Sequence, residues 1–389
     1  KRCFHPVTQD MNNTTTFRHV VLKGTTAQTG AAQAQVIAQI PAFINWLRSG
    51  NSIPDRPSFQ RTEQLMARFN PAGAEEIQAF CETLKIAPSD LYYYAATHLA
   101  ARHCSHLVAL PSITENSHVL VGRNYDFGDR MDDLRLVTTA IQGQYAHIGF
   151  STLLFGRQDG MNEKGLSVTM SVGGMPVSVQ PGFRPPIQEG LSFWALGRTL
   201  LDRCASVEEA VEIIREFPSC DNPIFLVADA TGAAVRVEIF GADKHFTRID
   251  ASTPAQYLVA TNHFQSAQIR ALEPMSMIHS TRRNHAAQQC LEQHSPQINS
   301  CVLKELLSTP YPNGLCCHYY DQMFGCLHSM VFDLNQRTVE VSFGSPAVNP
   351  WVHFDLSGSQ PGEFPSHLPR EQWPADFWQM DTCQQVEMD

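Results

Sequence analysis

The sequence changes character at Cys104, and this change limits the possible folds more than any other feature. Ahead of Cys104, apolar residues recur mostly at the spacing typical of helices. After Cys104, short runs rich in β-branched and aromatic residues predict strands. The chain therefore divides into a mostly helical segment, 1–103, and a β-rich region, 104–389.

The expected elements follow one another in blocks. The helices expected ahead of Cys104 are 36–47, with a kink at Pro41, 60–85 and 89–102, after one strand at 17–23. The strands expected after Cys104 are 118–123, 134–141, 146–152, 166–172, 223–228, 234–240, 257–261, 328–332 and 338–343. The helices expected among them are 190–203, 207–216 and 277–293. Blocks of strands, then helices, then strands predict two stacked sheets with helices outside, not alternating βαβ units. From about 352 a Pro- and Gly-rich tail is expected to extend over the surface.

The composition excludes several classes of protein. A net charge of −10 without a basic run argues against a nucleic-acid-binding surface. The sequence contains no apolar stretch of about 18 residues, which argues against a membrane span. The chain begins at Lys1, so the removal of a leader is left open.

The cysteines suggest a reducing environment. There are eleven of them, an odd number, at irregular spacing and without a CxxC pair. We therefore expect mostly reduced thiols and a cytoplasmic location. One cluster could hold a metal ion; it comprises Cys316, Cys317, His318, Cys326 and His328. A buried strand is the favoured interpretation of this stretch, because 330–332 continues it with apolar residues, and no metal is expected.

Cys104 could act as a nucleophile in two ways. A papain-like arrangement would use a distant histidine, but the sequence signatures of such proteases are absent. Alternatively, a cut between His103 and Cys104 would give Cys104 its own α-amine. Such an amine has a pKa near 7.7–8.0 and a thiol near 8.5, so the amine is a well-matched base at neutral pH. A nearby aspartate and arginine would then orient the amine and tune both groups.

Several motifs follow Cys104 in order. They are GRNYDF at 122–127, GMNEKGL at 160–166, ADATG at 228–232, TNHF at 261–264 and FGSP at 343–346. Together with Cys104 they resemble the N-terminal-nucleophile cysteine amidases, which include the choloylglycine (bile salt) hydrolases and the acyl-CoA:6-aminopenicillanate acyltransferases. The resemblance covers about 17–356. The long segment ahead of Cys104 is similar to that of the acyltransferase-like group, in which self-cleavage releases an α chain, here 1–103, from a β chain, here 104–389.

The resemblance implies a fold and a set of roles. The fold would be α+β, a four-layer αββα sandwich. Cys104 would be the nucleophile in self-cleavage at His103 and in turnover, with Asp126 holding its amine and Arg123 beside the thiolate. Asn262 would donate its side-chain amide to the oxyanion. Arg283 matches a further arginine of the family, although Arg282 could fill that place. Taken alone, each residue has an ordinary explanation as a core cysteine, an ion pair or a turn residue.

The substrate prediction rests on position. Phe127, Met170 and Phe264 are expected to line the pocket, which favours a small-molecule amide with an apolar or aromatic acyl group. Hydrolysis is favoured over acyl transfer, since water is always present as acceptor, and no cofactor is required. We expect no nucleic-acid or membrane partner and leave a homo-oligomer open. The alternatives are an unprocessed, inactive precursor and a non-catalytic small-molecule-binding member of the fold.

Three departures from the family pattern qualify this prediction. His103 stands at the scissile position, where the acyltransferases favour glycine. Val172 stands where bile salt hydrolases place an asparagine, so a backbone N–H would have to make that oxyanion contact. The stretch 316–318 lacks the basic residue that the acyltransferases often have after cysteine, which argues against penicillin-type substrates.

Overall fold

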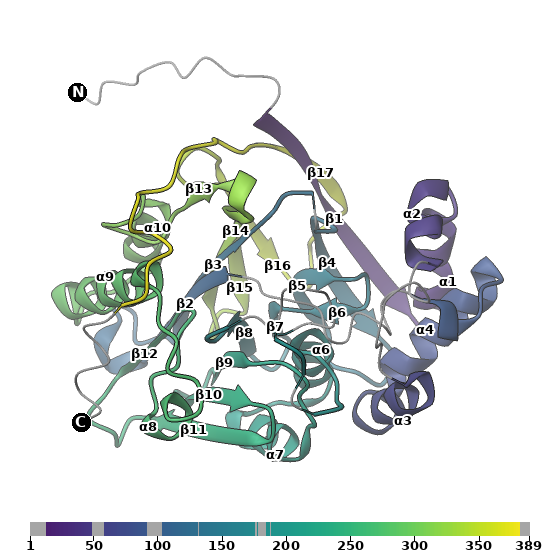
Figure 1. Ribbon diagram of the computed structural model, residues 1–389, viewed down its shortest axis with the longest axis horizontal. Helices are drawn as coiled ribbons and strands as arrows, with labels where there is room; N and C mark the ends of the chain where they lie inside the picture. The colour runs from purple at the N-terminus through teal and green to yellow at the C-terminus, as the bar shows by residue number, and fades with distance from the viewer. Residues whose placement is uncertain are drawn as a thin grey trace.

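The structure, a computed structural model, describes residues 13–48, 58–91, 103–130, 132–175, 177, 184–186 and 188–381. Its strands form two sheets (Figure 1). The strands of the larger sheet are, in spatial order, β11 (Asp243–Ile249), β10 (Ala234–Phe240), β9 (Pro223–Asp229), β8 (Leu166–Val172), β7 (Asp159–Asn162), β5 (His147–Thr152), β4 (Arg135–Ile141), β1 (Thr14–Gly24) and β17 (Gly362–His367), with β6 (Gly156–Arg157) paired to β5. The strands of the smaller sheet are β12 (Tyr257–Ala260), β2 (His103–Ala109), β3 (Leu120–Phe127), β14 (Phe324–Asp333), β15 (Thr338–Phe343) and β16 (Trp351–Asp355), with β13 (His318–Tyr319) paired to β14.

Helices cover the outer faces of both sheets. The α-helices are α1 (Thr26–Ile37), α2 (Pro41–Leu47), α3 (Phe59–Phe69), α4 (Pro71–Leu84), α6 (Phe193–Arg203), α7 (Val207–Glu216), α8 (Ala267–Arg270), α9 (Ile278–His294) and α10 (Ser300–Ser308), and the short 3-10 helices are η3 (Pro88–Asp90), η5 (Pro111–Ile113) and η6 (Tyr320–Gln322). In Figure 1, α1–α4 lie on one side of the molecule, and α9 and α10 on the opposite side. No helix among the described residues combines the length and the apolar composition that a membrane span requires.

Three apolar layers hold this arrangement together. One lies between the larger sheet and helices α1–α4, α6 and α7. The second lies between the two sheets and contains Cys104, Tyr125 and Phe127. The third lies between the smaller sheet and helices α9 and α10. The expected α+β, four-layer αββα sandwich is confirmed.

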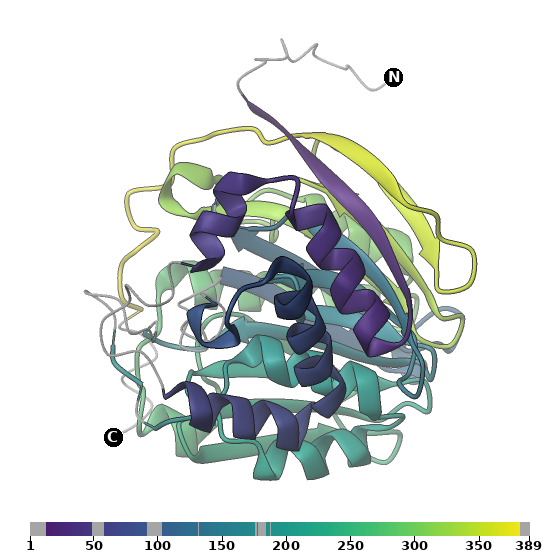
Figure 2. The same cartoon turned by 90° about the vertical axis from the view of Figure 1, so that its right-hand side faces the viewer.

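Strand β1 makes the segment ahead of Cys104 part of the sandwich. It pairs in parallel with β4 and antiparallel with β17, so it has a hydrogen-bonded neighbour on both edges. Figure 2 shows purple β1 running beside yellow β17, with α1–α4 packed in front of the sheets. Phe17, on β1, is fully buried between the sheets against Phe150 and Phe343. The larger sheet is therefore incomplete without this segment.

The helical patterns ahead of Cys104 are more broken than expected. Pro41 begins α2 instead of kinking a longer helix, because its ring is tolerated at the first helical position. Similarly, Asn70 and Pro71 divide the expected helix 60–85 into α3 and α4, and the Asn70 side chain accepts a hydrogen bond from the backbone N–H of Gly73. Of the helix expected at 89–102, η3 covers Pro88–Asp90, and 92–102 lie outside the described residues.

Other differences concern the edges of the sheets. Strand β11 was not expected, because it is a polar edge strand without an apolar face. The tail after Trp351 does not simply cover the surface, since it supplies β16 and β17. Pairing with β15 and β1 explains both strands, and such pairing depends on distant segments.

We expect Phe17→Ala to destabilise the whole molecule by about 3–5 kcal/mol, the typical loss for truncating a buried phenylalanine. The measurement is urea unfolding followed by tryptophan fluorescence. Arg18→Ala is the matched control, because Arg18 is the next residue of β1 and its side chain is 60% exposed. The control should lose about 0.5 kcal/mol or less. Equal losses in the two variants would contradict the buried role of β1.

Candidate active site

Cys104 lies near the start of β2, in the layer between the sheets. Its cross-strand partner on β3 is Tyr125, and its side chain is completely buried. Arg123 Nη2 donates a hydrogen bond to Cys104 Sγ at 3.3 Å. Burial raises the pKa of the thiol to about 11, although Arg123 lowers it in part. Cys104 is therefore a protonated thiol in this structure, and a base would be needed to make it a nucleophile.

The guanidinium of Arg123 is held by a buried carboxylate from the opposite sheet. Arg123 Nε donates to Asp159 Oδ2 at 2.6 Å, and Arg123 Nη1 donates to the backbone carbonyl of Met170. His328 Nε2 lies 2.9 Å from the same Asp159 oxygen. Burial alone would raise the pKa of Asp159, but His328 and Arg123 outweigh this effect and hold the pKa at about 2.

Asp159 was not expected at the site, and His328 was considered only as part of a possible metal cluster. Asp159 directly precedes the GMNEKGL motif and is the first residue of the short strand β7, and its place beside this motif was the signal that could have identified it. Its partners come from β3 and β14 of the other sheet, so the contact depends on how the sheets are stacked.

Asp126 lies across from His103, the residue before Cys104, and its carboxylate accepts no hydrogen bond from the described residues. It is fully buried on β3, where it pairs with His103 across to β2. Within the described part of the chain, neither of its carboxylate oxygens accepts a hydrogen bond. Arg283 Nη1 lies 3.7 Å from Asp126 Oδ2. Burial raises the pKa of Asp126 to about 7, and Arg283 offsets only part of that effect. A cation formed beside Asp126 would therefore find an acceptor already in place.

Arg283, on α9, binds the backbone of Cys104 and two neighbouring side chains, those of Ser105 and Asn262. Its Nη1 donates to the Cys104 carbonyl at 2.9 Å and to Ser105 Oγ at 2.6 Å. Its Nη2 donates to Asn262 Oδ1 at 2.8 Å. Arg282, the alternative, points away: its side chain is 44% exposed and pairs with Asp376 at 2.8 Å. The geometry therefore favours Arg283 over Arg282.

Asn262 faces Cys104 with its oxygen and not with its amide nitrogen. Asn262 Nδ2 donates to the Val172 carbonyl at 2.9 Å, and the Cys104 backbone N–H donates to Asn262 Oδ1 at 3.4 Å. Arginine can only donate and a carbonyl can only accept, so Arg283 and Val172 fix this orientation. In this structure the Asn262 amide nitrogen therefore donates to the Val172 carbonyl, and its donation to an oxyanion stays a prediction.

His103, which precedes Cys104, packs against aromatic rings. Its ring stacks on Phe324 with a centroid distance of 4.3 Å, and Trp378 lies 5.6 Å away. Burial, with a contribution from Arg283, lowers the pKa of His103 to about 3, so the ring is neutral. The tail residue Phe377 completes this cluster against Phe324.

The three expected pocket residues lie in different places. Phe127 shares the layer between the sheets with Cys104, and its ring lies 6.1 Å from that of Tyr125. Phe264 also belongs to this layer and packs against Gly173, which follows Val172. The Met170 side chain differs, because it packs among the helices on the outer face of the larger sheet.

The alternation of a strand explains the position of Met170. Its neighbours on β8, Thr169 and Ser171, both contact His106 of β2 and therefore face the inner layer. Met170 consequently points to the other face, and only its carbonyl reaches the site, through Arg123.

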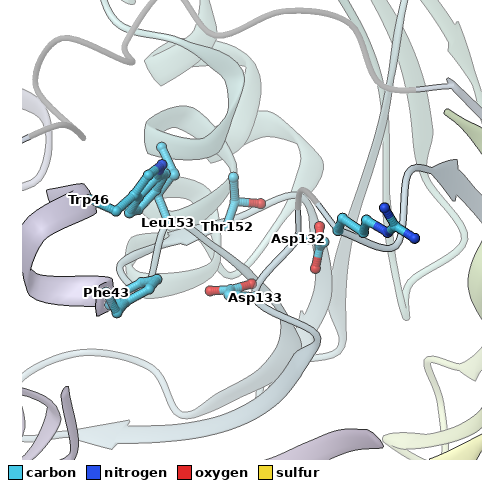
Figure 3. A pocket seen from close by; sticks show the side chains of 7 residues that line it. Phe43, Trp46, Asp132, Asp133, Thr152 and Leu153 are labelled. Atoms are coloured by element: carbon cyan, nitrogen blue, oxygen red, sulfur yellow. The ribbon is translucent and has the colours of Figure 1, made fainter. Parts of the chain in front are cut away.

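A cavity of about 290 Å³ lies beyond the end of β3 (Figure 3). Its lining residues are Phe43, Trp46, Arg130, Asp132, Asp133, Thr152 and Leu153. Tyr125, the cross-strand partner of Cys104, donates a hydrogen bond from its hydroxyl to Asp132 Oδ2 at 2.9 Å. One tyrosine side chain thus connects this cavity to the strand that carries Arg123 and Asp126.

The cluster of cysteines and histidines at 316–328 is divided in the structure. His328 contacts Asp159, whereas Cys316 and His318 gather around Ser345. Among the described residues, no three His, Cys, Asp or Glu side chains are placed to hold a metal ion.

Solved structures with related features include penicillin V acylase from Agrobacterium tumefaciens, with 18% identity, a TM-score of 0.41 and coverage of 67% of this chain and 90% of that chain. They also include a mutant of conjugated bile acid hydrolase from Clostridium perfringens, with 13% identity, a TM-score of 0.42 and coverage of 70% of this chain and 99% of that chain. A search of curated proteins gives no significant match.

The family is shown by a separate comparison. A model of the acyl-coenzyme A:6-aminopenicillanic acid acyl-transferase family matches residues 113–348, more than half of the chain. The matched region includes Arg123, Asp126, Asn262 and Arg283, and it begins shortly after Cys104. The resemblance found in the motifs is thereby confirmed: the chain belongs to the acyl-coenzyme A:6-aminopenicillanic acid acyl-transferase family.

Proposed function

We propose that this protein is an autoprocessing cysteine amidohydrolase or acyltransferase that cleaves a linear, non-peptide amide through an acyl-thioester on Cys104. The observation that carries the proposal is the environment of the Cys104 nitrogen. Asn262 Oδ1 faces that nitrogen, and the buried Asp126, one residue further along the strand pair, accepts no hydrogen bond among the described residues. Such a site suits an α-ammonium group better than a peptide N–H.

Self-cleavage would create that amine. Cys104 Sγ attacks the carbonyl carbon of His103, the C–N bond breaks, and the thiol proton ends on the released nitrogen. Water then hydrolyses the thioester, which leaves a carboxylate on His103 and restores the thiol of Cys104. Arg123 stabilises the developing thiolate, and Arg283 holds the Cys104 carbonyl in place.

Turnover would repeat this chemistry on a substrate. The free α-amine of Cys104 removes the thiol proton, Sγ attacks the amide carbon, and the departing amine takes the proton back. Water or a second amine then attacks the thioester and regenerates the thiol. Asn262 remains our candidate oxyanion donor, with a substrate oxygen replacing the Val172 carbonyl as acceptor for Nδ2.

The proposed substrate is a small amide with an apolar or aromatic acyl group. Phe127 and Phe264 lie in the same apolar layer as Cys104 and support this choice, whereas Met170 no longer does. Hydrolysis is favoured over transfer, because water is always present. The complete burial of Cys104 in the uncut chain favours one alternative, an inactive precursor until the bond before Cys104 is cut.

We expect the purified wild-type chain to give two masses under denaturing conditions, corresponding to 1–103 and 104–389. Cys104→Ala should give only the full-length mass, because it lacks the attacking sulfur. Wild type should also release 4-nitroaniline from phenylacetyl or hexanoyl anilides, and Cys104→Ala should not. The buried Cys81→Ala is the matched control and should behave as wild type.

Different outcomes separate the alternatives. An uncut wild-type chain that gains activity once His103→Gly permits cleavage would identify a trapped precursor. Cleaved protein that binds the anilides without turning them over would identify a binding protein. Addition of hydroxylamine during turnover, with acyl hydroxamate as product, would measure the share of acyl transfer.

Arg283→Lys should slow self-cleavage by about tenfold or more, since a lysine cannot reproduce the forked contacts to Cys104, Ser105 and Asn262. The time course of intact mass after purification measures this rate. Arg282→Lys is the matched control, because Arg282 pairs with Asp376 near the surface. If both variants cleave at the same rate, Arg283 does not position the scissile bond.

The raised pKa of Asp126 predicts a pH-dependent cost in stability. Its carboxyl has a pKa of about 7 in the folded state and about 3.9 when unfolded. The folded state thus binds this proton more tightly, and stability falls as pH rises from about 4 to about 7. In the uncut Cys104→Ala background, Asp126→Asn should remove this loss.

The gain from Asp126→Asn should grow between pH 5 and pH 8, by up to about 3 kcal/mol. Urea unfolding at the two pH values, followed by fluorescence, measures the gain. Asp243→Asn, at an exposed position of β11, serves as the control and should show no such trend. A gain that is equal at both pH values would contradict the raised pKa.

A further inference from the structure

A second thiol site lies close to the proposed active site and takes no part in its chemistry. Cys316 precedes β13, and its Sγ lies 3.3 Å from His318 Nε2 and 3.3 Å from Ser345 Oγ. His318 Nε2 and Ser345 Oγ are 2.7 Å apart, so the three groups form a triangle. On the other side of the imidazole, His318 Nδ1 lies 3.0 Å from Glu371 Oε1.

These contacts fit a thiolate paired with an imidazolium. His318 can then donate from Nε2 to Ser345, while the Ser345 hydroxyl donates to the Cys316 sulfur, and Nδ1 faces Glu371 as an ion pair. Hydrogen bonds from Cys326, His318 and Ser345 lower the pKa of Cys316 to about 5 in spite of its burial. Burial alone would lower the pKa of His318, but its contacts with Cys316 and Glu371 raise this pKa to about 9.

The partner thiol, Cys326, has a raised pKa, unlike Cys316. It lies on β14, and its backbone N–H donates to the Cys317 carbonyl at 2.8 Å, which holds it against the 316–317 segment. An interaction between the two thiols shifts the pKa of Cys316 down and that of Cys326 up. Burial keeps the pKa of Cys326 well above its usual value, so it is a neutral thiol. The same holds for Cys317, the neighbour of Cys316 in sequence. Within this group, only Cys316 has the electrostatic environment of a reactive cysteine.

We propose that Cys316 and Cys326 are a hydroperoxide-sensitive dithiol that closes to a disulfide on oxidation. The Cys316 thiolate attacks the peroxide, an S–O bond forms, the O–O bond breaks, and the leaving oxygen takes up a proton as water or an alcohol. The Cys326 thiol then attacks the sulfenic sulfur, an S–S bond forms and water leaves. The two sulfurs lose two electrons in total, and the peroxide gains them.

The dithiol lies close enough to the surface for a peroxide to reach it, and its charge affects the pKa of Asp126. Glu371, which covers His318, has a side chain that is 55% exposed, so the pair lies one side chain beneath the surface. The negative charge of Cys316 also raises the pKa of Asp126. A neutral disulfide would remove this charge, and Asp126 would ionise more readily.

The test uses the full-length Cys104→Ala chain, which lacks the catalytic thiol and leaves the outcome independent of self-cleavage. The protein is treated with equimolar hydrogen peroxide at about pH 6.5, where Cys316 is expected to be a thiolate and its neighbours Cys317 and Cys326 neutral thiols. Remaining thiols are blocked, and non-reducing peptide mapping is performed. We expect the loss of two hydrogens and a reductant-sensitive crosslink from the 316–317 peptide to the Cys326 peptide.

Serine variants in the same background assign the crosslink. Cys316→Ser should abolish it, whereas Cys317→Ser, the matched neighbour, should retain it. Cys326→Ser should accumulate a sulfenic acid at Cys316, which dimedone traps. A crosslink that survives Cys316→Ser would overturn the proposal. So would oxidation of the exposed Cys301 with Cys316 and Cys326 left as thiols, a result read from the Cys104→Ala chain even if a serine variant fails to fold.

Discussion

The buried ion pair between Arg123 and Asp159 is the interaction on which the candidate site depends. Its two partners come from different sheets, both are fully shielded from water, and their atoms lie 2.6 Å apart. Burying two charges is costly unless each finds further partners. Here His328 and the Phe150 backbone N–H also contact the Asp159 carboxylate. The Met170 carbonyl and the Cys104 sulfur accept further hydrogen bonds from the Arg123 guanidinium. The same ion pair therefore holds the two sheets together and positions the Cys104 thiol.

The charges around Cys104 are not balanced in the same way. Arg283 has several acceptors, but Asp126 has no hydrogen-bond donor among the described residues, and burial keeps its pKa high. A peptide nitrogen offers Asp126 no charge, whereas an ammonium group at the same place would. The uncut chain therefore has an acidic position that is unfavourable when ionised and that chain cleavage would relieve. If the chain cleaves itself as proposed, relief of this imbalance would favour cleavage in addition to the hydrolysis of the bond.

Local sequence patterns predicted most of the fold. The helix expected at 207–216 coincides with α7, because its start is set within one turn, where the Ser206 side chain accepts from the backbone N–H of Glu209. The candidates Arg123 and Asp126 could likewise be identified from one short motif, whereas the sequence left Arg282 open beside Arg283. The strand alternation could also have excluded Met170, since Thr169 and Ser171 occupy the inner face.

What the sequence did not reveal depends on distant contacts. Asp159 and His328 become meaningful only once the two sheets are stacked. The orientation of the Asn262 amide is set by Arg283, 21 residues away, and by Val172, 90 residues away. Strand β17 forms only because β1 offers it an edge.

The position of β1 between β4 and β17 has a consequence for the product of cleavage. Cutting the chain before Cys104 would remove one covalent bond and leave both ladders of β1 intact. The piece 1–103 would then be a permanent subunit of a two-chain protein and not a discarded leader. An affinity handle on either piece would retrieve the other under native conditions. The piece 104–389 made alone would expose unpaired edges on β4 and β17, and such edges promote aggregation.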